Sequence, residues 1–244
     1  MKVVAVIPAL NEEAAIGLVV RAIPPVVTRT VVVDNGSRDR TASVADAGGA
    51  LVVYETQRGY GAACMAGFRA EPDADVYVFL DGDGSDPPER VPDLLDRLID
   101  SEADLVLGAR RGAVEPGSMY WHQRLGNVFM SWLIRRLTGA PVHDLASFKL
   151  VRGSVLRDLE IKDRQQGWTA ELITACAVRR LRISEVSTGY RRRIGKSKVS
   201  GSTSGSLKAA YRLNAAILRV WLGAMIAGMR SPDLGATAGT RRDK

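Results

Sequence analysis

Three aspartates lie within six residues of one another in the segment FLDGDGSDPPE, which spans residues 79–89. Carboxylates this close repel one another unless a cation, a donor-rich ligand or water lies between them. Carboxylate oxygens are the ligands that Mg²⁺ and Mn²⁺ favour, and both ions commonly link a protein to the phosphates of a substrate. Asp81 and Asp83 are therefore candidate ligands for Mg²⁺ or Mn²⁺, and Asp86 is expected to cap the helix that follows.

A calcium loop of the EF-hand type beginning at Asp81 is the competing interpretation of these aspartates. Its sixth position would be Asp86, where such loops need glycine, and its twelfth would be Pro92, where they need glutamate. The spacing therefore excludes that loop.

Short apolar runs alternate with amphipathic segments through the first half of the chain. The runs are rich in Val and Leu and too short for helices, so they predict buried parallel strands at Val3–Ile7, Thr30–Val33, Leu51–Tyr54, Val76–Leu80 and Leu105–Leu107. The helix-like stretches between them lie near Glu12–Ala22, Arg40–Ala47, Gly61–Ala70 and Glu89–Ser101. This alternation predicts an α/β fold, with a doubly wound, mostly parallel sheet and helices on both faces.

Polar segments follow four of the predicted strands. They read PALNEE at residues 8–13, DNGS at 34–37, RGYG at 58–61 and DGDGSD at 81–86. Each could be a capping turn, but ligands of an open parallel sheet bind beyond the carboxyl ends of its strands. The fingerprints GxGxxG and GxxxxGKS/T are absent, so a divalent cation is the expected means of holding phosphates.

The second half of the chain is less regular. We expect helices at Trp121–Leu137 and Thr169–Arg180, a strand at Ser147–Val151, a strand entering a basic loop over 182–198, and a long helix at Ser206–Met229. No long linker marks a second domain, so residues 1–230 are predicted to form one domain and 231–244 a disordered tail.

The composition narrows the class of partner. A net charge of +7 favours an anionic ligand such as a nucleotide, a phosphate or an acidic lipid, whereas nucleic acid is disfavoured because no recognition motif occurs. Cys64 and Cys176 are expected to pack as small residues, and with His122 and His143 as the only histidines no HExxH zinc site can form. Met1 leads directly into a strand pattern, from which we expect a cytoplasmic protein.

Six segments carry a resemblance to a known family: VIPALNEE, VVDNGSRDRT, RGYGAACMAGF, FLDGDGSDPPE, DLASFKLVR and YRRRIGKSKVSG. In this order, over roughly residues 2 to 210, they resemble family 2 glycosyltransferases of the GT-A fold. Within that family the chain is most similar to the dolichyl- and polyprenyl-phosphate sugar transferases. The resemblance implies a metal-dependent enzyme that inverts the configuration at the sugar's C1.

The resemblance also implies roles for matching residues on the nucleotide side. Pro8, Asn11 and Glu12 would line the nucleoside pocket, and Asp34 would contact the base or the ribose. The family's third loop, which closes on the nucleotide, would include Arg58 and Gly61.

Further matches concern the metal and the acceptor. Asp81 and Asp83 would form the family's metal-binding DxD element, with Ser85 as a third ligand where relatives often carry glutamine. Asp144 matches the family's acceptor-side aspartate, in a loop one residue shorter than in the dolichyl-type relatives. Gly195–Lys198 matches a G-x-S-K element that would bind phosphate of the donor or the acceptor.

A basic run without acids surrounds that last element, and its members are Arg191, Arg192, Arg193, Lys196 and Lys198. Arg193, Lys196 and Lys198 are candidate phosphate ligands, and the glycines and serines that follow suit a loop that orders over bound substrate. The alternative is a solvated surface loop.

The need for a catalytic base depends on the acceptor. A phosphate acceptor has a second pKa of about 6 and attacks without losing a proton to the protein. A hydroxyl acceptor requires a carboxylate within hydrogen-bond reach, for which Asp144 and Glu171 are the candidates. Glu171 could equally be a helix residue paired with an arginine.

The last predicted helix has an apolar stretch between Arg219 and Arg230 that is about half as long as a membrane span. It could pack on the domain, form a homodimer, or lie in a membrane interface, and packing or dimerisation is favoured.

We therefore expect a cytoplasmic protein that transfers a UDP- or GDP-linked hexose-type sugar to a polyprenyl phosphate. A peripheral position on the inner membrane face is left open as an alternative. The alternative within the enzyme class is a small soluble hydroxyl acceptor. A sugar-1-phosphate nucleotidyltransferase is disfavoured because PALNEE replaces the glycine-rich loop after the first strand. An inactive nucleotide-sugar-binding protein is disfavoured because Asp81, Asp83 and Asp144 are all present.

Overall fold

A computed structural model describes residues 1–195 and 203–228 of the chain. In its first half, strands and helices alternate as expected: β1 (Val3–Ala9), α1 (Ile16–Ala22), β2 (Arg29–Asp34), α2 (Thr41–Ala47), β3 (Leu51–Tyr54), α3 (Tyr60–Ala70), β4 (Val76–Phe79), α4 (Val91–Asp100) and β5 (Leu105–Ala109). The second half contains α5 (Trp121–Thr138), β6 (Lys149–Arg152), α6 (Gly153–Asp158), α7 (Trp168–Val178), β7 (Ile183–Ser187) and α8 (Thr203–Ile226).

The strands form one seven-stranded sheet in the order β3-β2-β1-β4-β6-β5-β7. All neighbouring pairs are parallel except those of β6, which is antiparallel to both β4 and β5. A strand antiparallel to β5 begins at the edge of the sheet where β5 ends. Residues 110–148, which include α5, therefore leave and re-enter the sheet at its carboxyl edge.

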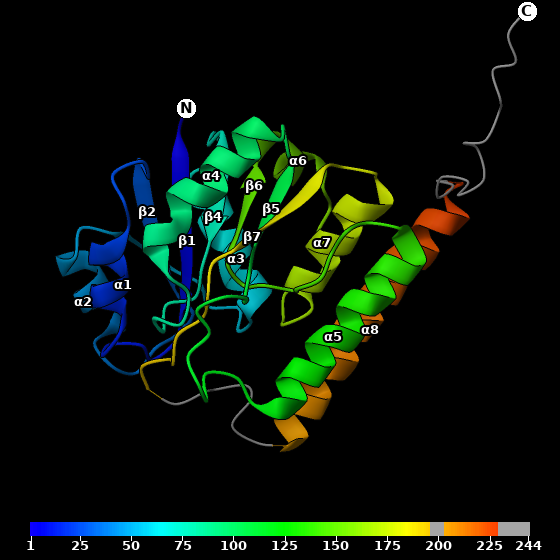
Figure 1. Cartoon of the computed structure of the whole chain (residues 1–244). Coiled ribbons are helices and arrows are strands. Elements are labelled where there is room, and N and C mark those ends of the chain that lie inside the picture. Colours follow the sequence, from blue (N-terminus) through cyan, green and yellow to red (C-terminus); the bar gives the residue numbers. More distant parts are fainter. Residues whose placement is uncertain (196–202, 229–244) are drawn as a thin grey trace, which may run out of the picture.

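Both faces of the sheet are covered by helices, as Figure 1 shows. Val4 and Val6 of β1 pack into a core with α3, α6 and α7, whereas Val3 and Ile7 pack into a second core with α1, α2 and α4. This alternation follows from the two-residue period of a strand. Burial on both sides explains why the strands appear in the sequence as continuous apolar runs.

Two helices lie side by side at one end of the molecule, away from the sheet (Figure 1). α5 and α8 contact each other and both contact α7. Trp221 of α8 donates its indole N–H to the backbone oxygen of Leu137 in α5, at 3.2 Å. Within the described residues, no helix is long and apolar enough to cross a membrane.

The start of the first helix and the role of Asp86 differ from the sequence-based expectations. The first helix was expected from Glu12, but α1 begins at Ile16 because residues 12–15 form a turn in which the oxygen of Glu12 accepts the N–H groups of Ala15 and Ile16. The prediction that Asp86 caps a helix is wrong, because neither the turn at Pro88–Arg90 nor α4 has a side-chain cap. The predicted tail at 231–244 lies outside the described residues.

Candidate functional site

A cavity of about 330 Å³ opens at the carboxyl edge of the sheet, and we call it the carboxyl-edge cavity. It brings together six of the residues predicted from the sequence, namely Pro8, Glu12, Arg58, Asp81, Asp83 and Arg193. Pro8 lies at the end of β1, and the other five come from the segments after β1, β3, β4 and β7, which meet at the cavity although they are far apart in the chain.

Asn11 and Asp34, two further predicted residues, support the cavity from outside its lining. Asn11 adopts a left-handed backbone conformation with φ of 52°, and its side-chain oxygen accepts the N–H of Arg38 at 2.7 Å. Asp34 accepts the N–H of Ser37 at 2.6 Å, and Ser37 in turn accepts the N–H of Asn11 at 2.9 Å. The loops after β1 and β2 are thereby tied together.

The loop after β3 is held by Asn35, a lining residue that sequence reasoning did not single out. The amide of Asn35 donates to the oxygens of Glu55 and Gln57 at 2.9 and 2.8 Å, and accepts the N–H of Gly59 at 2.8 Å. Its position in the segment DNGS was the signal that could have identified it.

A close backbone approach explains the glycine at position 61. A Cβ atom there would lie 2.5 Å from the oxygen of Asp163 and 2.7 Å from the Cβ of Trp168. Because Gly61 has no side chain, the segment before α7 can approach α3 closely enough to border the cavity. Gln165 and Gln166 of that segment contribute to the lining. Gln165 also donates to the oxygen of Arg58 at 2.5 Å. No sequence pattern indicated these two glutamines.

The aspartate segment after β4 is internally hydrogen-bonded. Asp86 accepts the N–H of Asp81 at 3.0 Å and the hydroxyl of Ser147 at 3.0 Å, so it closes the loop instead of capping a helix. Asp83 accepts both the N–H and the hydroxyl of Ser85, at 2.9 and 2.6 Å. Ser85 is fully buried and orients the carboxylate of Asp83 from behind, outside the cavity lining.

Burial and mutual repulsion make the ionised state of the carboxylates in this segment unfavourable. Burial, followed by the charges of Asp86 and Asp83, raises the pKa of Asp81 to about 8. Burial also raises the pKa of Asp86 to about 6. Carboxylates in this state favour a cation beside them.

A buried lysine provides part of the compensating charge. Lys149 of β6 is fully buried, and its ammonium donates to the oxygen of Ser147 at 2.7 Å and the hydroxyl of Thr169 at 3.3 Å. Burial lowers the pKa of Lys149 to about 8, while the carboxylates of Asp81 and Asp86 oppose that shift. The motif DLASFKLVR contains this lysine, but its burial was not foreseen.

Arg193 lies beside the metal-ligand candidates. Its Nη2 is 2.9 Å from Oδ2 of Asp83 and 3.3 Å from Oε1 of Glu12. Its Nε is buried and has no hydrogen-bond partner within the described residues. The segment after β7 holds Arg193 there, because Arg191 and Ile194 donate their N–H groups to the oxygens of Ser85 and Asp83.

The residues fit a divalent cation by their chemistry. Asp81 and Asp83 both line the cavity, and carboxylate oxygens are what Mg²⁺ and Mn²⁺ prefer. In the described part of the chain there is no group of three or more His, Cys, Asp or Glu side chains placed to surround one ion. A metal held by this pair would therefore need further ligands from substrate or water. Lys196 and Lys198, the other predicted phosphate ligands, lie outside the described residues.

A second cavity, of about 480 Å³, lies between the loop after β5 and α5, and we call it the basic cavity. Its lining includes Arg110, Arg111, Arg124, Arg135 and His143. Asp144 is its one acidic lining residue among those described. The concentration of guanidinium groups suits a phosphate or another anion.

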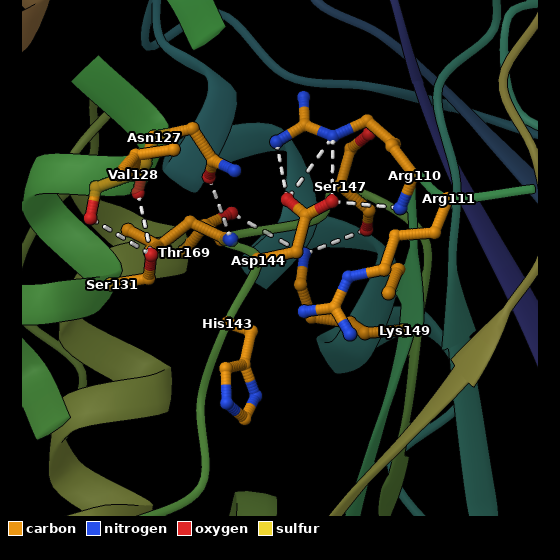
Figure 2. Close-up of polar contacts among 12 residues, drawn as sticks. Arg110, Arg111, Asn127, Val128, Ser131, His143, Asp144, Ser147, Lys149 and Thr169 are labelled. Carbon is orange, nitrogen blue, oxygen red and sulfur yellow. Dashed lines mark hydrogen bonds and ion pairs between the residues drawn. The ribbon is translucent and has the colours of Figure 1, made fainter. Parts of the chain in front are cut away.

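Asp144 forms an ion pair with Arg110 (Figure 2). Its carboxylate accepts the N–H of Arg110 at 2.7 Å and the guanidinium of Arg110 at 2.5 Å. The same guanidinium lies 5.5 Å from the ring centre of Tyr190. Asp144 is thus placed to fix Arg110 at the wall of the basic cavity.

Glu171 lines neither cavity. It lies in the first turn of α7 and accepts the N–H groups of Lys162 and Asp163 at 3.0 and 2.6 Å. Arg219 of α8 is 3.6 Å from its carboxylate. Of the two interpretations of Glu171, this geometry favours a helix residue paired with an arginine over a catalytic base.

Comparisons of the sequence with known proteins identify a family and several relatives. Residues 4–185 match Glycosyl transferase family 2. An uncharacterised glycosyltransferase of Mycobacterium tuberculosis is 43% identical over 208 residues, covering 85% of this chain and 94% of that protein. The dolichyl-phosphate hexose transferase of Haloferax volcanii is 37% identical over 201 residues, covering 80% and 86%.

A solved structure provides a further comparison. Glucosyl-3-phosphoglycerate synthase from Mycobacterium tuberculosis, in complex with Mn²⁺, UDP-glucose and phosphoglyceric acid, superposes with a TM-score of 0.75 at 25% identity. The match covers 96% of this chain and 81% of that one. The fold is therefore GT-A, as the resemblance implied. The chain is a glycosyltransferase and belongs to glycosyltransferase family 2.

Proposed function

We propose that this enzyme transfers a hexose-type sugar from a UDP- or GDP-linked donor to a polyprenyl phosphate, with inversion at C1. The observation that carries the proposal is the pair of neighbouring cavities, one lined by Asp81 and Asp83 and the other by four arginines. The loop 144–147 connects them, because Asp144 lines the basic cavity while Ser147 bonds to Asp86 of the aspartate segment.

The carboxyl-edge cavity would hold the donor. In this assignment Pro8 and Glu12, which line the cavity, would contact the nucleoside, while Asn11 and Asp34 would hold the loops around it in place. The lack of a side chain at Gly61 leaves room for the segment before α7 to border the donor. Arg58 and Arg193 would pair with the diphosphate, since guanidinium groups bind phosphate in a bidentate manner. Asp81 and Asp83 would hold Mg²⁺ or Mn²⁺, which supplies charge stabilisation to the leaving diphosphate.

The basic cavity would hold the phosphate of the acceptor. One phosphate oxygen forms the new bond to C1, the bond from C1 to the donor's diphosphate breaks, and the diphosphate leaves with the electron pair. The acceptor oxygen is already ionised near neutral pH, so no carboxylate has to remove a proton. Asp144 then serves to position Arg110, and Glu171 serves the fold.

A small soluble acceptor is the second candidate. The solved relative binds phosphoglyceric acid, and a cavity lined by arginines suits the phosphate of such a molecule as well as that of a lipid. If the soluble acceptor reacts through a hydroxyl, Asp144 is the carboxylate nearest to the basic cavity and becomes the candidate base.

A partition assay tests the proposal. Purified protein is incubated with Mn²⁺, labelled UDP- or GDP-sugars and a short polyprenyl phosphate, and the label is then extracted into an organic phase. Label in the organic phase supports the lipid acceptor and identifies the donor base. Label that stays aqueous while nucleotide binding remains metal-dependent contradicts the lipid acceptor and favours the soluble one.

Arg111→Gln, in the basic cavity, should slow transfer and leave nucleotide binding unchanged.

A further inference from the structure

An exposed apolar stripe runs along the outer side of α5. Trp121, Leu125, Phe129 and Trp132 recur at helical spacing and are 74%, 61%, 51% and 49% exposed. The buried side of the same helix, at Met130 and Ile134, packs into the core. Large apolar side chains gathered on one face of a helix are uncommon at a protein surface unless that face binds something.

α8 has a similar stripe. Leu222 and Met225 are 50% and 51% exposed, while Ala216 and Ile217 of the same helix are fully buried. Because α5 and α8 contact each other and both contact α7, their exposed stripes lie on the side of the helix pair that faces away from α7. We call the residues of the two stripes the α5–α8 face. Figure 1 shows the two helices side by side.

The charge of the two helices is of one sign. α5 contains three arginines and α8 contains two arginines and one lysine, and neither helix contains aspartate or glutamate. Of these, Arg124 and Arg136 are exposed along the stripe of α5. Arg219 of α8 already lies 3.6 Å from the carboxylate of Glu171, so the cations of this surface are Arg124 and Arg136 of α5. Exposed apolar side chains beside these two cations are complementary to an anionic surface that also has an apolar layer.

We propose that the α5–α8 face binds the surface of an anionic lipid bilayer. Tryptophan and leucine side chains would enter the boundary between headgroups and acyl chains, as they do in interfacial helices, and the arginines would contact lipid phosphates. Neither helix is long and apolar enough to span a bilayer, which is consistent with helices that lie in its plane.

A second copy of the chain fits this face less well. A symmetric pairing brings the surface against itself, so the exposed arginines of α5 would enter the interface from both copies. Like charges across an interface are unfavourable, and these helices supply no carboxylate to separate them.

The basic cavity borders the proposed bilayer contact. Val128 is exposed at the edge of the α5 stripe and also lines that cavity, as does Arg124. A bilayer bound to the α5–α8 face would therefore lie beside the entrance of the arginine-lined site. The membrane contact itself does not depend on which acceptor the enzyme uses.

Cosedimentation with vesicles tests the proposal without donor or acceptor. The full chain is mixed with vesicles of phosphatidylcholine, alone or with about one third phosphatidylglycerol. We expect binding to the anionic vesicles that weakens as salt is raised, and much weaker binding to phosphatidylcholine alone. The combined variant Leu125→Glu, Leu222→Glu should reduce binding to anionic vesicles by about tenfold or more.

Ile99→Glu is the matched control, since Ile99 is 50% exposed on α4 and lies on another surface. It should bind vesicles as the wild type does, and circular dichroism should show all variants folded.

Arg136→Gln should lower binding to anionic vesicles without affecting binding to phosphatidylcholine. The proposal is overturned if wild type fails to bind anionic vesicles at low salt, or if the double variant binds them equally well. A dimer in sedimentation velocity that the double variant dissociates, without vesicle binding, would assign the face to a second copy.

Discussion

The guanidinium of Arg193 bonds to the carboxylate of Asp83 at 2.9 Å, in the cavity where the sequence predicts a divalent cation. The same guanidinium lies 3.3 Å from Glu12, so one protein cation meets two carboxylates there. An ion bound to Asp83 would compete with Arg193 for that carboxylate. Arg193 would then be available to pair with the diphosphate of a donor.

This competition predicts opposite effects of one substitution on two ligands. Arg193→Gln should tighten the binding of Mn²⁺ alone, because it removes a competing positive charge beside Asp83. It should weaken the binding of a UDP-sugar in the presence of Mn²⁺ by about tenfold, because a charge-assisted pair with phosphate is lost. Calorimetric titrations with each ligand measure both effects.

Arg58→Gln is the matched control for that experiment. Arg58 lines the same cavity, but its guanidinium packs against Gly36 and not against the aspartate segment. It should weaken nucleotide binding and leave the affinity for Mn²⁺ alone unchanged. If Arg193→Gln weakens both ligands equally, Arg193 does not exchange between Asp83 and the diphosphate.

Asp83→Ala should abolish the metal dependence of nucleotide binding. The substitution removes a carboxylate that lines the cavity and that a divalent ion would use to hold the diphosphate. Nucleotide affinity measured with and without Mn²⁺ provides the readout. Asp96→Ala, on the exposed side of α4, is the control and should retain the wild-type difference. An unchanged metal effect in Asp83→Ala would overturn the assignment of the metal site.

Glu171→Gln should affect stability more than transfer to a phosphate acceptor. The carboxylate accepts two backbone N–H groups, and a carboxamide can accept only with its oxygen, so we expect a loss of about 1–2 kcal/mol in the free energy of unfolding. Chemical denaturation measures that loss, and the partition assay measures transfer. A large drop in the rate of transfer by folded protein would instead identify Glu171 as a catalytic base.

Two glycine substitutions should shift stability in opposite directions. Gly223→Ala lies in α8, where an added Cβ meets nothing within 4 Å, so it should stabilise the protein by up to about 1 kcal/mol. Gly61→Ala lies in α3, where the added atom would be 2.5 Å from the oxygen of Asp163, so it should destabilise the protein and weaken donor binding. Thermal unfolding compares the two, and equal effects would exclude the close approach at Gly61.

The two thiols should be unreactive in the native protein. Burial, with a contribution from Asp104, raises the pKa of Cys176 to about 12, and burial raises the pKa of Cys64 further. At pH 8 a thiol with a pKa of about 12 is ionised to about one part in ten thousand, and the thiolate is the reactive form. Alkylation should therefore require unfolding, and rapid labelling of folded protein would contradict the packing role.

The sheet and the edge that carries the site were predictable because both depend on local patterns. Apolar runs indicated the strands, and the polar segments after them met at one edge because parallel strands end together. The partner of Asp144 was not predictable in this way. Arg110 lies 34 residues earlier, and the two are brought together only because the chain returns to the sheet at the carboxyl edge.

Asp86 illustrates a second limit. A carboxylate just before Pro87 and Pro88 is typical of a helix start, but here its acceptors are already used by Asp81 and by the distant Ser147. Lys149 is similar, because a lysine in an apolar strand gives no sign of the hydroxyl and carbonyl groups that receive its ammonium. Long-range polar contacts override local preference in both cases.

The reversed direction of β6 makes residues 110–148 one continuous segment that leaves the sheet and returns to it at the same edge. The pairing of β6 with β4 and β5 therefore does not require this segment to have a particular length. Changes in the exposed part of this segment, before Asp144, would alter the arginine-lined wall and the tryptophan-bearing helix together. They would leave in place Ser147, which holds Asp86 in the loop after β4. Under the proposed function, one donor site could therefore serve different acceptors through changes confined to this one segment.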